Sequence, residues 1–412
     1  MTATSQSGAC ATLLVSLLAL ACSSPAGPTE SPVVTPASNV GGVPPAYRSI
    51  ELGTLGGTSA TPFDVNDAGV VVGTSADATT DQGRPFTWTA GAGMRALGDF
   101  AGTAMAVSQR GTVVGVARLD ASVAFGHAFV WTAANGAKDL GVLRTAAGDY
   151  SVANGVNAQD DIVGTDGSGS LQAFVGSAEQ GLTPIPASGE SQAFAINDRG
   201  EIAASESQGG TLPIQPFVWQ ASGQRTDISV PAGLNAAKPA DINDAGDVTG
   251  DYSLLATPND VQGFVWSSRG GFESFGFGAN TSTVPVAIND RGEVVGNFAQ
   301  LDTGRFGVFL WSKSGGLVDL TDRLGERSVA FGLNSQGWIV GIQYESLDPV
   351  AWRAMVWIPD YSQPSQRVAA RPNASVAAID PATKAALLRC FTDPSVRGNK
   401  AAFAACATAP GR

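Results

Sequence analysis

The chain has 412 residues, of which 43% are apolar, 15% charged and 8% aromatic, and its formal net charge at pH 7 is -12. This apolar share is too high for a disordered chain, and the length is sufficient for a large core or for roughly two or three domains. The acidic balance argues against nucleic-acid binding, because phosphate recognition needs a basic surface, and a single histidine excludes a histidine-rich metal site.

Residues 1–22 are predicted to be an export signal. Their apolar run, Leu13–Leu20, is shorter than the ~20 residues that span a bilayer. The run leads into Ala21-Cys22, which resembles the end of a bacterial lipoprotein signal in which Cys22 becomes the lipid-bearing first residue. The alternative is ordinary signal-peptidase cleavage nearby, with Cys22 lost. Residues 23–46 are rich in Pro, Ser and Thr and predict an extended tether.

One pattern recurs seven times between residues 47 and 361. A Phe-x-Trp signature begins at Phe86, Phe129, Phe217, Phe264 and Phe309, with degenerate copies at Phe174 and Met355, at spacings of 43, 45, 43, 47, 45 and 46 residues. About twenty residues before each signature lies a turn such as Asn289–Gly292. Asn can bond its own backbone there, and Gly accepts the positive φ of a tight hairpin.

Each repeat divides into four short strands. In the sixth repeat we expect them at Pro285–Asn289, Glu293–Phe298, Gly307–Ser312 and Leu317–Asp322. Phe and Trp of the third strand share one face and should fill the layers between neighbouring sheets, because side chains alternate along a strand. The first strand is rich in small residues, as expected of an innermost strand crowded against its equivalents.

Four-stranded units of this length are typical of β-propeller blades. The seventh repeat lacks a fourth strand after Pro359, whereas Tyr47–Gly53 resembles the fourth strands of other repeats. An open β-solenoid would also explain repeats but gives no reason for this complementary gap. We therefore predict an all-β fold, a seven-bladed β-propeller over 47–361 that is closed by its N-terminal strand and followed by a short C-terminal helical tail.

Residues 362–412 are predicted to be a linker and a helical tail, with Ala-rich helices at Pro381–Phe391 and Gly398–Ala407. Cys390 and Cys406 form an isolated pair, which in an exported protein predicts a disulfide; free thiols are the alternative. Such a bond would stabilise the clip by about 3 kcal/mol. The tail is cationic on an anionic body, so it either docks there or remains a solvated appendage.

Several segments together resemble the HAF-type bacterial extracellular repeat family. These are Leu52–Gly57, the repeated Asn-Asp-x-Gly-x-Val-Val-Gly units and Gly126–Trp131 with its His-Ala-Phe sequence. The resemblance covers roughly residues 47 to 358. It implies an exported repeat protein and brings no established activity with it.

Searches for catalytic and metal motifs lead to local explanations. Asp64 with Asn66, and Asp241 with Asn243, partly mimic a calcium loop but lack a third oxygen ligand and the closing Glu, so hairpin-turn chemistry explains both. His127 is expected to bond locally at the end of a strand. The sequence contains no nucleophile elbow, Walker loop or dinucleotide fingerprint, so we predict no cofactor and no metal site.

Loop lengths locate the expected binding face. The connections between the second and third strands (B–C) and between successive repeats (D–A) vary, whereas the other two are short turns. We expect a ligand on the variable face, with contact aromatics Tyr150, Tyr252, Phe306, Tyr344 and Trp352; the alternative is that these only pack the loops. Carboxylate pairs for catalysis could come from Asp77, Asp81, Asp120, Asp149, Asp251, Asp260, Asp302 and Asp348, or these could form a solvated acidic surface.

The sequence thus favours an exported, non-enzymatic, monomeric propeller, lipid-anchored through Cys22 at the bacterial outer membrane, cell surface or periplasm. Its expected partner is a protein or glycan, and the lipid is its only membrane contact. A carboxylate-dependent carbohydrate-active enzyme, a glycoside hydrolase or lyase, is the alternative on the same fold. A passive structural surface protein is a third class.

Overall fold

A computed structural model describes residues 44–79, 82–120, 125–144, 149–167, 170–207, 214–254, 257, 260–347, 350–362, 381–393, 396, 402 and 406. The chain divides into two compact units, residues 1–33 and 34–412, and every described residue belongs to the second. The expected signal, with the lipidation residue Cys22, and nearly all of the expected tether lie outside the described residues.

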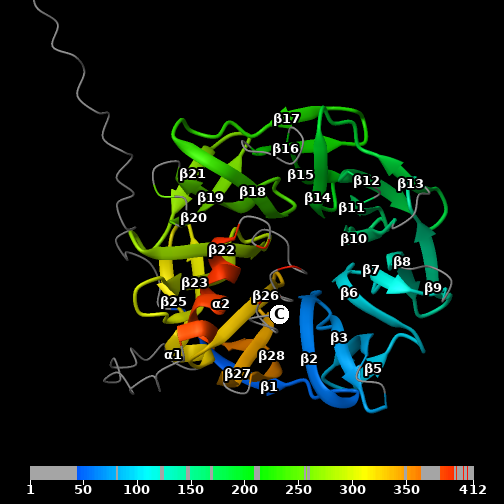
Figure 1. Cartoon of the computed structure of the whole chain (residues 1–412), viewed down its shortest axis with the longest axis horizontal. Helices are drawn as coiled ribbons and strands as arrows, with labels where there is room; N and C mark the ends of the chain where they lie inside the picture. Colours follow the sequence, from blue (N-terminus) through cyan, green and yellow to red (C-terminus); the bar gives the residue numbers. More distant parts are fainter. Residues whose placement is uncertain are drawn as a thin grey trace, which may run out of the picture. The chain divides into compact units, whose positions relative to one another are not determined.

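The described strands form seven four-stranded antiparallel sheets arranged in a ring, so the predicted seven-bladed β-propeller is confirmed (Figure 1). The inner strands are β2 (Gly56–Val65), β6 (Ala101–Val107), β10 (Ser151–Val156), β14 (Glu190–Ile196), β18 (Leu234–Ile242), β22 (Thr281–Ile288) and β26 (Ser328–Leu333). The second strands are β3 (Val71–Asp77), β7 (Val113–Arg118), β11 (Ile162–Asp166), β15 (Glu201–Ser207), β19 (Val248–Leu254), β23 (Val294–Gln300) and β27 (Ile339–Leu347). The third strands are β4 (Gly83–Thr89), β8 (His127–Thr132), β12 (Gln172–Ser177), β16 (Ile214–Gln220), β20 (Val261–Ser267), β24 (Phe306–Ser312) and β28 (Val350–Asp360).

The outer strands show how the ring closes. Six blades take theirs from β5 (Gly93–Ala96), β9 (Gly136–Gly141), β13 (Gly181–Pro184), β17 (Arg225–Asp227), β21 (Gly271–Phe275) and β25 (Gly316–Asp319). The seventh takes β1 (Ala46–Glu51), which pairs with β28 in the register Tyr47 to Pro359 through Glu51 to Met355. The predicted latch of the N-terminal strand onto the last blade is therefore confirmed.

Packing between blades follows the repeated aromatic residues. The Phe side chains of the third strands are fully buried in six blades, and Trp357 is fully buried in the seventh. Phe275 of the fifth blade stacks on Trp311 of the sixth, with ring centroids 4.8 Å apart. The Gly that ends the second-strand pattern allows a close approach to the inner strand and to these rings: a Cβ at Gly250 would come within 2.0 Å of the Lys238 carbonyl oxygen and 2.8 Å of the Phe264 ring. The expected role of the aromatics is confirmed.

A ring of asparagine side chains joins neighbouring blades at the A–B turns. Each Asn side-chain amide donates to a backbone carbonyl of the next blade, from Asn66 to Ser108 (2.9 Å), Asn157 to Asn197 (3.2 Å), Asn197 to Asn243 (2.9 Å), Asn243 to Asn289 (3.0 Å), Asn289 to Asn334 (3.1 Å) and Asn334 to Asn66 (3.0 Å). The last link connects the seventh blade to the first. The second blade has Ser108 instead of Asn, and its hydroxyl accepts the backbone N–H of Thr112.

One strand end differs from expectation. The fourth strand of the sixth blade, expected at Leu317–Asp322, ends at Asp319, and Asp322 lies in a short helix, α1 (Thr321–Leu324). The carboxylate of Asp319 accepts the backbone N–H of Thr321 at 2.8 Å, and this local turn redirects the chain before the strand can continue.

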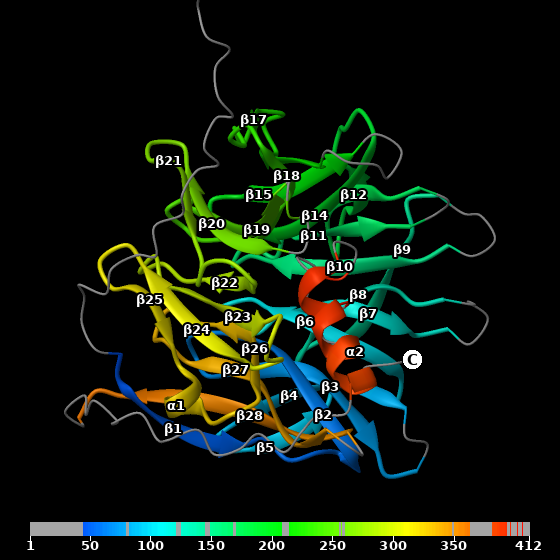
Figure 2. The ribbon, with the colours of Figure 1, turned by 60° about the vertical axis from the view of Figure 1, so that its left-hand side comes forward.

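The C-terminal helix α2 (Pro381–Thr392) lies against β22 and β23 (Figures 1 and 2). Cys390 and Cys406 are joined by a disulfide, as predicted, with their Cα atoms 5.6 Å apart. Most of the second expected helix, Gly398–Ala407, lies outside the described residues. Among the described residues, no helix combines the length and apolar character that crossing a membrane requires.

The asparagine ring leads to a stability prediction. Asn334→Ala removes the donor to the Asn66 carbonyl and the acceptor of the backbone N–H groups of Gln336 and Trp338, all at a side chain that is 4% exposed. Leaving buried polar groups without partners should lower the free energy of unfolding by about 3 kcal/mol. Chemical denaturation followed by tryptophan fluorescence measures the loss.

Two further variants control this prediction. Asn334→Asp keeps the acceptor, but it sets a carboxylate oxygen against the Asn66 carbonyl and adds a buried negative charge beside six other carboxylates, so its cost at pH 7 should be at least as large as that of Asn334→Ala. Ser108→Asn would supply the missing amide of the ring and should raise the free energy of unfolding by about 1 kcal/mol. Equal stability of Asn334→Ala and the unaltered protein would show that the ring does not hold the blades together.

Candidate functional site at the channel mouth

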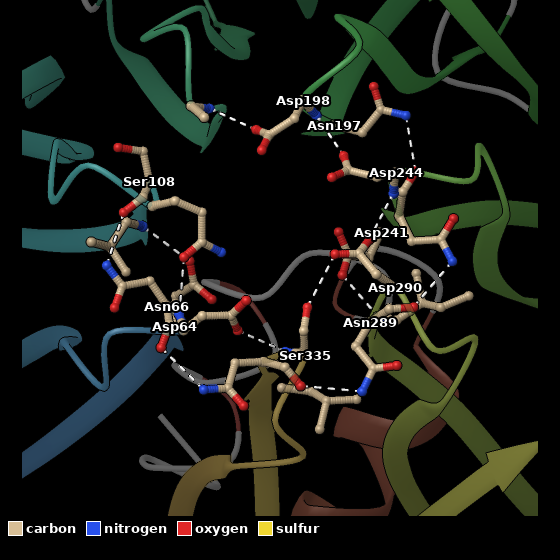
Figure 3. A pocket seen from close by; sticks show the side chains of 18 of the residues that line it. Asp64, Asn66, Ser108, Asn197, Asp198, Asp241, Asp244, Asn289, Asp290 and Ser335 are labelled. Carbon is tan, nitrogen blue, oxygen red and sulfur yellow. Dashed lines mark hydrogen bonds between the residues drawn. The ribbon is translucent and has the colours of Figure 1, made fainter.

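A hollow of about 150 Å³ lies where the seven A–B turns converge around the axis of the ring (Figure 3). Its lining comes from the last residues of the inner strands and the turns that follow, in all seven blades. Asx turns shape this rim: in the sixth blade, for example, Asn289 accepts the backbone N–H groups of Arg291 and Glu293. The turn also needs a positive φ, which Gly292 supplies at 70°.

Six carboxylates line the hollow: Asp64, Asp67, Asp198, Asp241, Asp244 and Asp290. Four occupy the second position of an A–B turn. Asp64 and Asp241 instead follow the β-bulge of β2 and β18, at a position where the other five blades have Ala or Gly. Among the described residues that line the hollow, none is Lys or Arg. The mouth therefore carries concentrated negative charge, which attracts cations and repels anions.

These carboxylates also connect the blades. Asp290 accepts the backbone N–H of Asp244 at 2.9 Å, and Asp244 accepts that of Asp198 at 2.8 Å. Deeper in the channel, Asp64 accepts the N–H of Val107 and Asp241 accepts that of Ile288, at 3.0 and 2.9 Å. A second belt of side chain to backbone bonds thus lies beside the asparagine ring, and it fixes the directions in which the carboxylates point.

Asp244 is the mouth carboxylate with a clearly altered acidity. Partial burial raises its pKa, and the negative charges of Asp290 and Asp198 raise it further. The hydrogen bond from the Asp198 backbone and the positive charge of Arg199 act in the opposite direction. Asp244 therefore holds a proton more readily than an ordinary aspartate.

Metal binding has no support from a ligand cluster. Among the described residues, no group of three or more His, Cys, Asp or Glu side chains has the arrangement needed to hold a metal ion. The two sequence segments that partly mimic calcium loops, at Asp64 and Asp241, use their carboxylates as acceptors for backbone N–H groups of their own and the next blade.

The five aromatics expected to contact a ligand lie at the opposite end of the channel or inside a blade. Tyr252, Tyr344 and Phe306 are 1%, 4% and 6% exposed, and burial raises the pKa of both tyrosines. Trp352 is partly buried and donates through Nε1 to the Ala60 carbonyl at 2.9 Å. Tyr150 is partly buried, and its carbonyl accepts the N–H of Gly167. Their role as ligand contacts stays a prediction, and for Phe306 and Tyr344, which share a hydrophobic cluster with Phe391, it would require the C-terminal helix to move.

None of the described carboxylates chosen from the variable loops lines the hollow. Asp81 and Asp348 lie outside the described residues, and of the others Asp77 is bound by Arg84, whose Nε is 2.6 Å away. His127 is at the start of β8 with its Nδ1 3.0 Å from an oxygen of Asp139, so the expected local bond is confirmed.

Asp67, Asp198, Asp244 and Asp290 belong to predicted turns and are not among the site residues predicted from the sequence. The signal was nevertheless present: the same acidic residue follows Asn in four repeats. In a closed ring, equivalent positions of successive repeats face the same axis, so these four charges must converge there.

Comparisons with known proteins support the fold. No protein-family model and no curated protein sequence matches the chain. Among solved structures, it is similar to an oligogalacturonate lyase in complex with manganese, at 9% identity and a TM-score of 0.51, over 78% of this chain and 98% of the lyase chain. It is also similar to a prolyl endopeptidase, at 12% identity and a TM-score of 0.51, over 76% of this chain. The match spans about half (47%) of the endopeptidase chain.

The raised pKa of Asp244 leads to a pH prediction. The folded protein binds this proton more readily than the unfolded chain, so ionised Asp244 lowers stability at neutral pH, and this penalty disappears as the pH falls below the ordinary value of 3.8. Asp244→Asn keeps an acceptor for the Asp198 N–H and removes the charge. It should raise the melting temperature at pH 7 and have little effect near pH 3.

A matched control is Glu326→Gln, which removes one negative charge at an exposed position on the D–A connection before β26. Thermal melts of both variants from pH 3 to 8 make the comparison. A melting temperature of Asp244→Asn that is lower than that of the unaltered protein at pH 7 would contradict the prediction.

Proposed function

We propose that the protein is a carboxylate-dependent carbohydrate-active enzyme of the glycoside hydrolase type, with its working site at the acidic channel mouth. One observation carries the proposal: six carboxylates surround one hollow, and one of them, Asp244, has a raised pKa. Glycoside hydrolysis commonly needs two carboxyl groups held at different acidities. The hollow supplies such groups from adjacent blades.

The roles follow from acidity. Asp244 would donate a proton to the leaving glycosidic oxygen, because partial burial raises its pKa and makes the protonated form more accessible than in an ordinary aspartate. Asp198 or Asp290, one blade away on either side, would be the second carboxyl group, the one that activates water or attacks the sugar. A hollow of about 150 Å³ suits a single sugar residue more than an enclosed oligosaccharide.

The negative charge of the channel mouth favours hydrolysis of neutral or amino sugars over cleavage of uronates. A uronate carboxylate would be repelled by the acidic mouth, whereas a protonated amino sugar would be attracted to it. The similarity to an oligogalacturonate lyase, at 9% identity, supports the shared fold only. The substrate class is therefore argued from the charge of the channel mouth.

Non-enzymatic binding is the second candidate, and a specific observation favours it. The mouth carboxylates already accept backbone N–H groups of neighbouring blades, so they would be needed for structure even without catalysis. The same mouth would then recognise a glycan or a cationic protein segment without turnover.

The turnover test uses neutral and amino-sugar aryl glycosides and short oligosaccharides as probes. We expect Asp244→Asn to lower kcat/KM by at least about 100-fold, as loss of a general acid does, while the melting temperature at pH 7 rises. Glu326→Gln should leave the rate unchanged. Glycan binding without turnover in the unaltered protein, weakened by Asp244→Asn, would favour the second candidate. If the unaltered protein shows neither turnover nor glycan binding, both candidate functions are contradicted.

We also propose that the propeller is exported and held at a membrane by lipid on Cys22. The lipoprotein-like segment before Cys22 and the resemblance to HAF-type extracellular repeats support this location. Cys22→Ser should move the protein from the membrane fraction to the soluble fraction when the full chain is produced in a bacterial host. Unchanged membrane partitioning of that variant would contradict a lipid anchor at Cys22.

A further inference from the structure

A second hollow, of about 340 Å³, lies beside the acidic mouth at the boundary between the third and fourth blades. We call it the side hollow and define it by Gln159, Asp161, Asp198, Arg199, Gly200 and Gln220. Its residues come from the A–B turns of the two blades and from the end of β16. Asp198 lines both this hollow and the acidic mouth (Figure 3). The two hollows therefore adjoin on one face of the ring.

At other blade boundaries an arginine fills the equivalent space. In the fourth blade, Arg199 and Glu201 form an ion pair that lies over Gly246, the turn glycine of the fifth blade. A Cβ at Gly246 would come within 2.5 Å of Arg199 Nη2 and 3.0 Å of Glu201 Oε2. Arg291 covers Gly337 of the seventh blade in the same way, within 2.8 Å of such a Cβ. An arginine at this turn position therefore covers the turn glycine of the following blade.

The third blade lacks this arginine, and the side hollow results. Gln159 and Asp161 occupy the positions that Arg199 and Glu201 occupy in the fourth blade, and both side chains are shorter. A Cβ at Gly200 would meet no other atom within 4 Å in the part of the chain that the structure describes. The side hollow is thus the space that an arginine and a glutamate fill at the next boundary.

The side chains around the side hollow offer both hydrogen-bond donors and acceptors. Gln159 is exposed, and its side-chain amide has no hydrogen-bond partner among the described residues. Gln220 adds a second amide, Asp161 a carboxylate and Arg199 a guanidinium group. These groups can exchange hydrogen bonds with the hydroxyls of a sugar. The volume lies near the lower end of the range of small-molecule sites, about 300–1,000 Å³.

We propose that the side hollow is a subsite for the sugar residue next to the one held in the acidic mouth, so that the ligand is a glycan of at least two neutral or amino-sugar residues. The inference rests on the proposed function, in which the mouth receives a single sugar residue. It also distinguishes the two candidates for the second carboxyl group. A glycan that extends from the mouth into the side hollow passes Asp198 and not Asp290.

Hydrogen bonds hold Asp198 at this passage. Its carboxylate accepts the backbone N–H of Ala158 in the third blade at 2.7 Å, and its own N–H donates to Asp244 in the fifth blade at 2.8 Å. Asp198 therefore links the turn that carries Gln159 to the proposed proton donor. The border between the two hollows is fixed by bonds to both neighbouring blades.

The test closes the side hollow with the chain's own solution. The double variant Gln159→Arg/Asp161→Glu reproduces the ion pair of the fourth blade at the boundary where it is missing. The probes are glucose, galactose, mannose and glucosamine, and disaccharides of the same sugars. Isothermal titration calorimetry on the full chain gives, for each sugar, the ratio of disaccharide affinity to monosaccharide affinity.

For the preferred sugar we expect this ratio to be at least about 10 in the unaltered protein, as one or two additional net hydrogen bonds provide. The double variant should lower the ratio to about 1, because only the mouth still holds a sugar residue. The matched control is Glu179→Gln, which changes the net charge by the same amount at an exposed position on the C–D turn of the third blade. It should keep the ratio of the unaltered protein.

The outcomes separate this subsite from the proposed function. A ratio that the double variant leaves unchanged overturns the subsite, even if Asp244→Asn abolishes turnover as expected. A ratio that falls in the double variant of a protein without turnover supports the subsite and contradicts the enzyme. No binding of any disaccharide in this set overturns the subsite.

Gln159→Ala, together with circular dichroism and thermal melts, guards against misfolding. It removes only an exposed amide, so the melting temperature should not change, and the ratio should fall by about 5-fold. If the double variant loses the sheet signal, Gln159→Ala decides: a lower ratio supports the subsite, and an unchanged ratio overturns it.

Discussion

The ring of asparagine amides is the interaction on which the rest of the structure depends. Each amide donates to the backbone of the next blade, and the bond from Asn334 to the Asn66 carbonyl joins the seventh blade to the first. These bonds are buried and therefore costly to lose. They link neighbouring A–B turns at six of the seven blade boundaries, so the carboxylates that these turns carry are held beside one another.

Closing the ring therefore has an electrostatic consequence. Asp198, Asp244 and Asp290 are separated by more than forty residues each in the chain, yet each is hydrogen-bonded to the next across a blade boundary. Partial burial raises the pKa of Asp244, the negative charges of Asp290 and Asp198 raise it further, and the ionised form of Asp244 therefore opposes folding at neutral pH. A cost of this kind concentrated at one hollow is typical of a functional site, where stability is given up for chemistry.

The two ends of the channel differ in chemistry because different parts of the repeat form them. Tight A–B turns present Asn and Asp at one end, whereas aromatic side chains from the strands, such as Phe306 of β24 and Tyr344 of β27, gather in a buried cluster with α2. The first end is polar and open, and the second is covered by α2.

The sequence alone determined the repeat count, the four strands of each blade, the buried Phe and Trp layers, the latch of Tyr47–Gly53 and the Cys390–Cys406 pair. These features follow from local periodicity and from a gap that only one segment can fill. It did not identify Asp244 as a site residue or predict where α2 docks. Acidity at the mouth depends on distances across blades, and docking of α2 depends on an apolar surface assembled from several blades, so tertiary structure alone decided both.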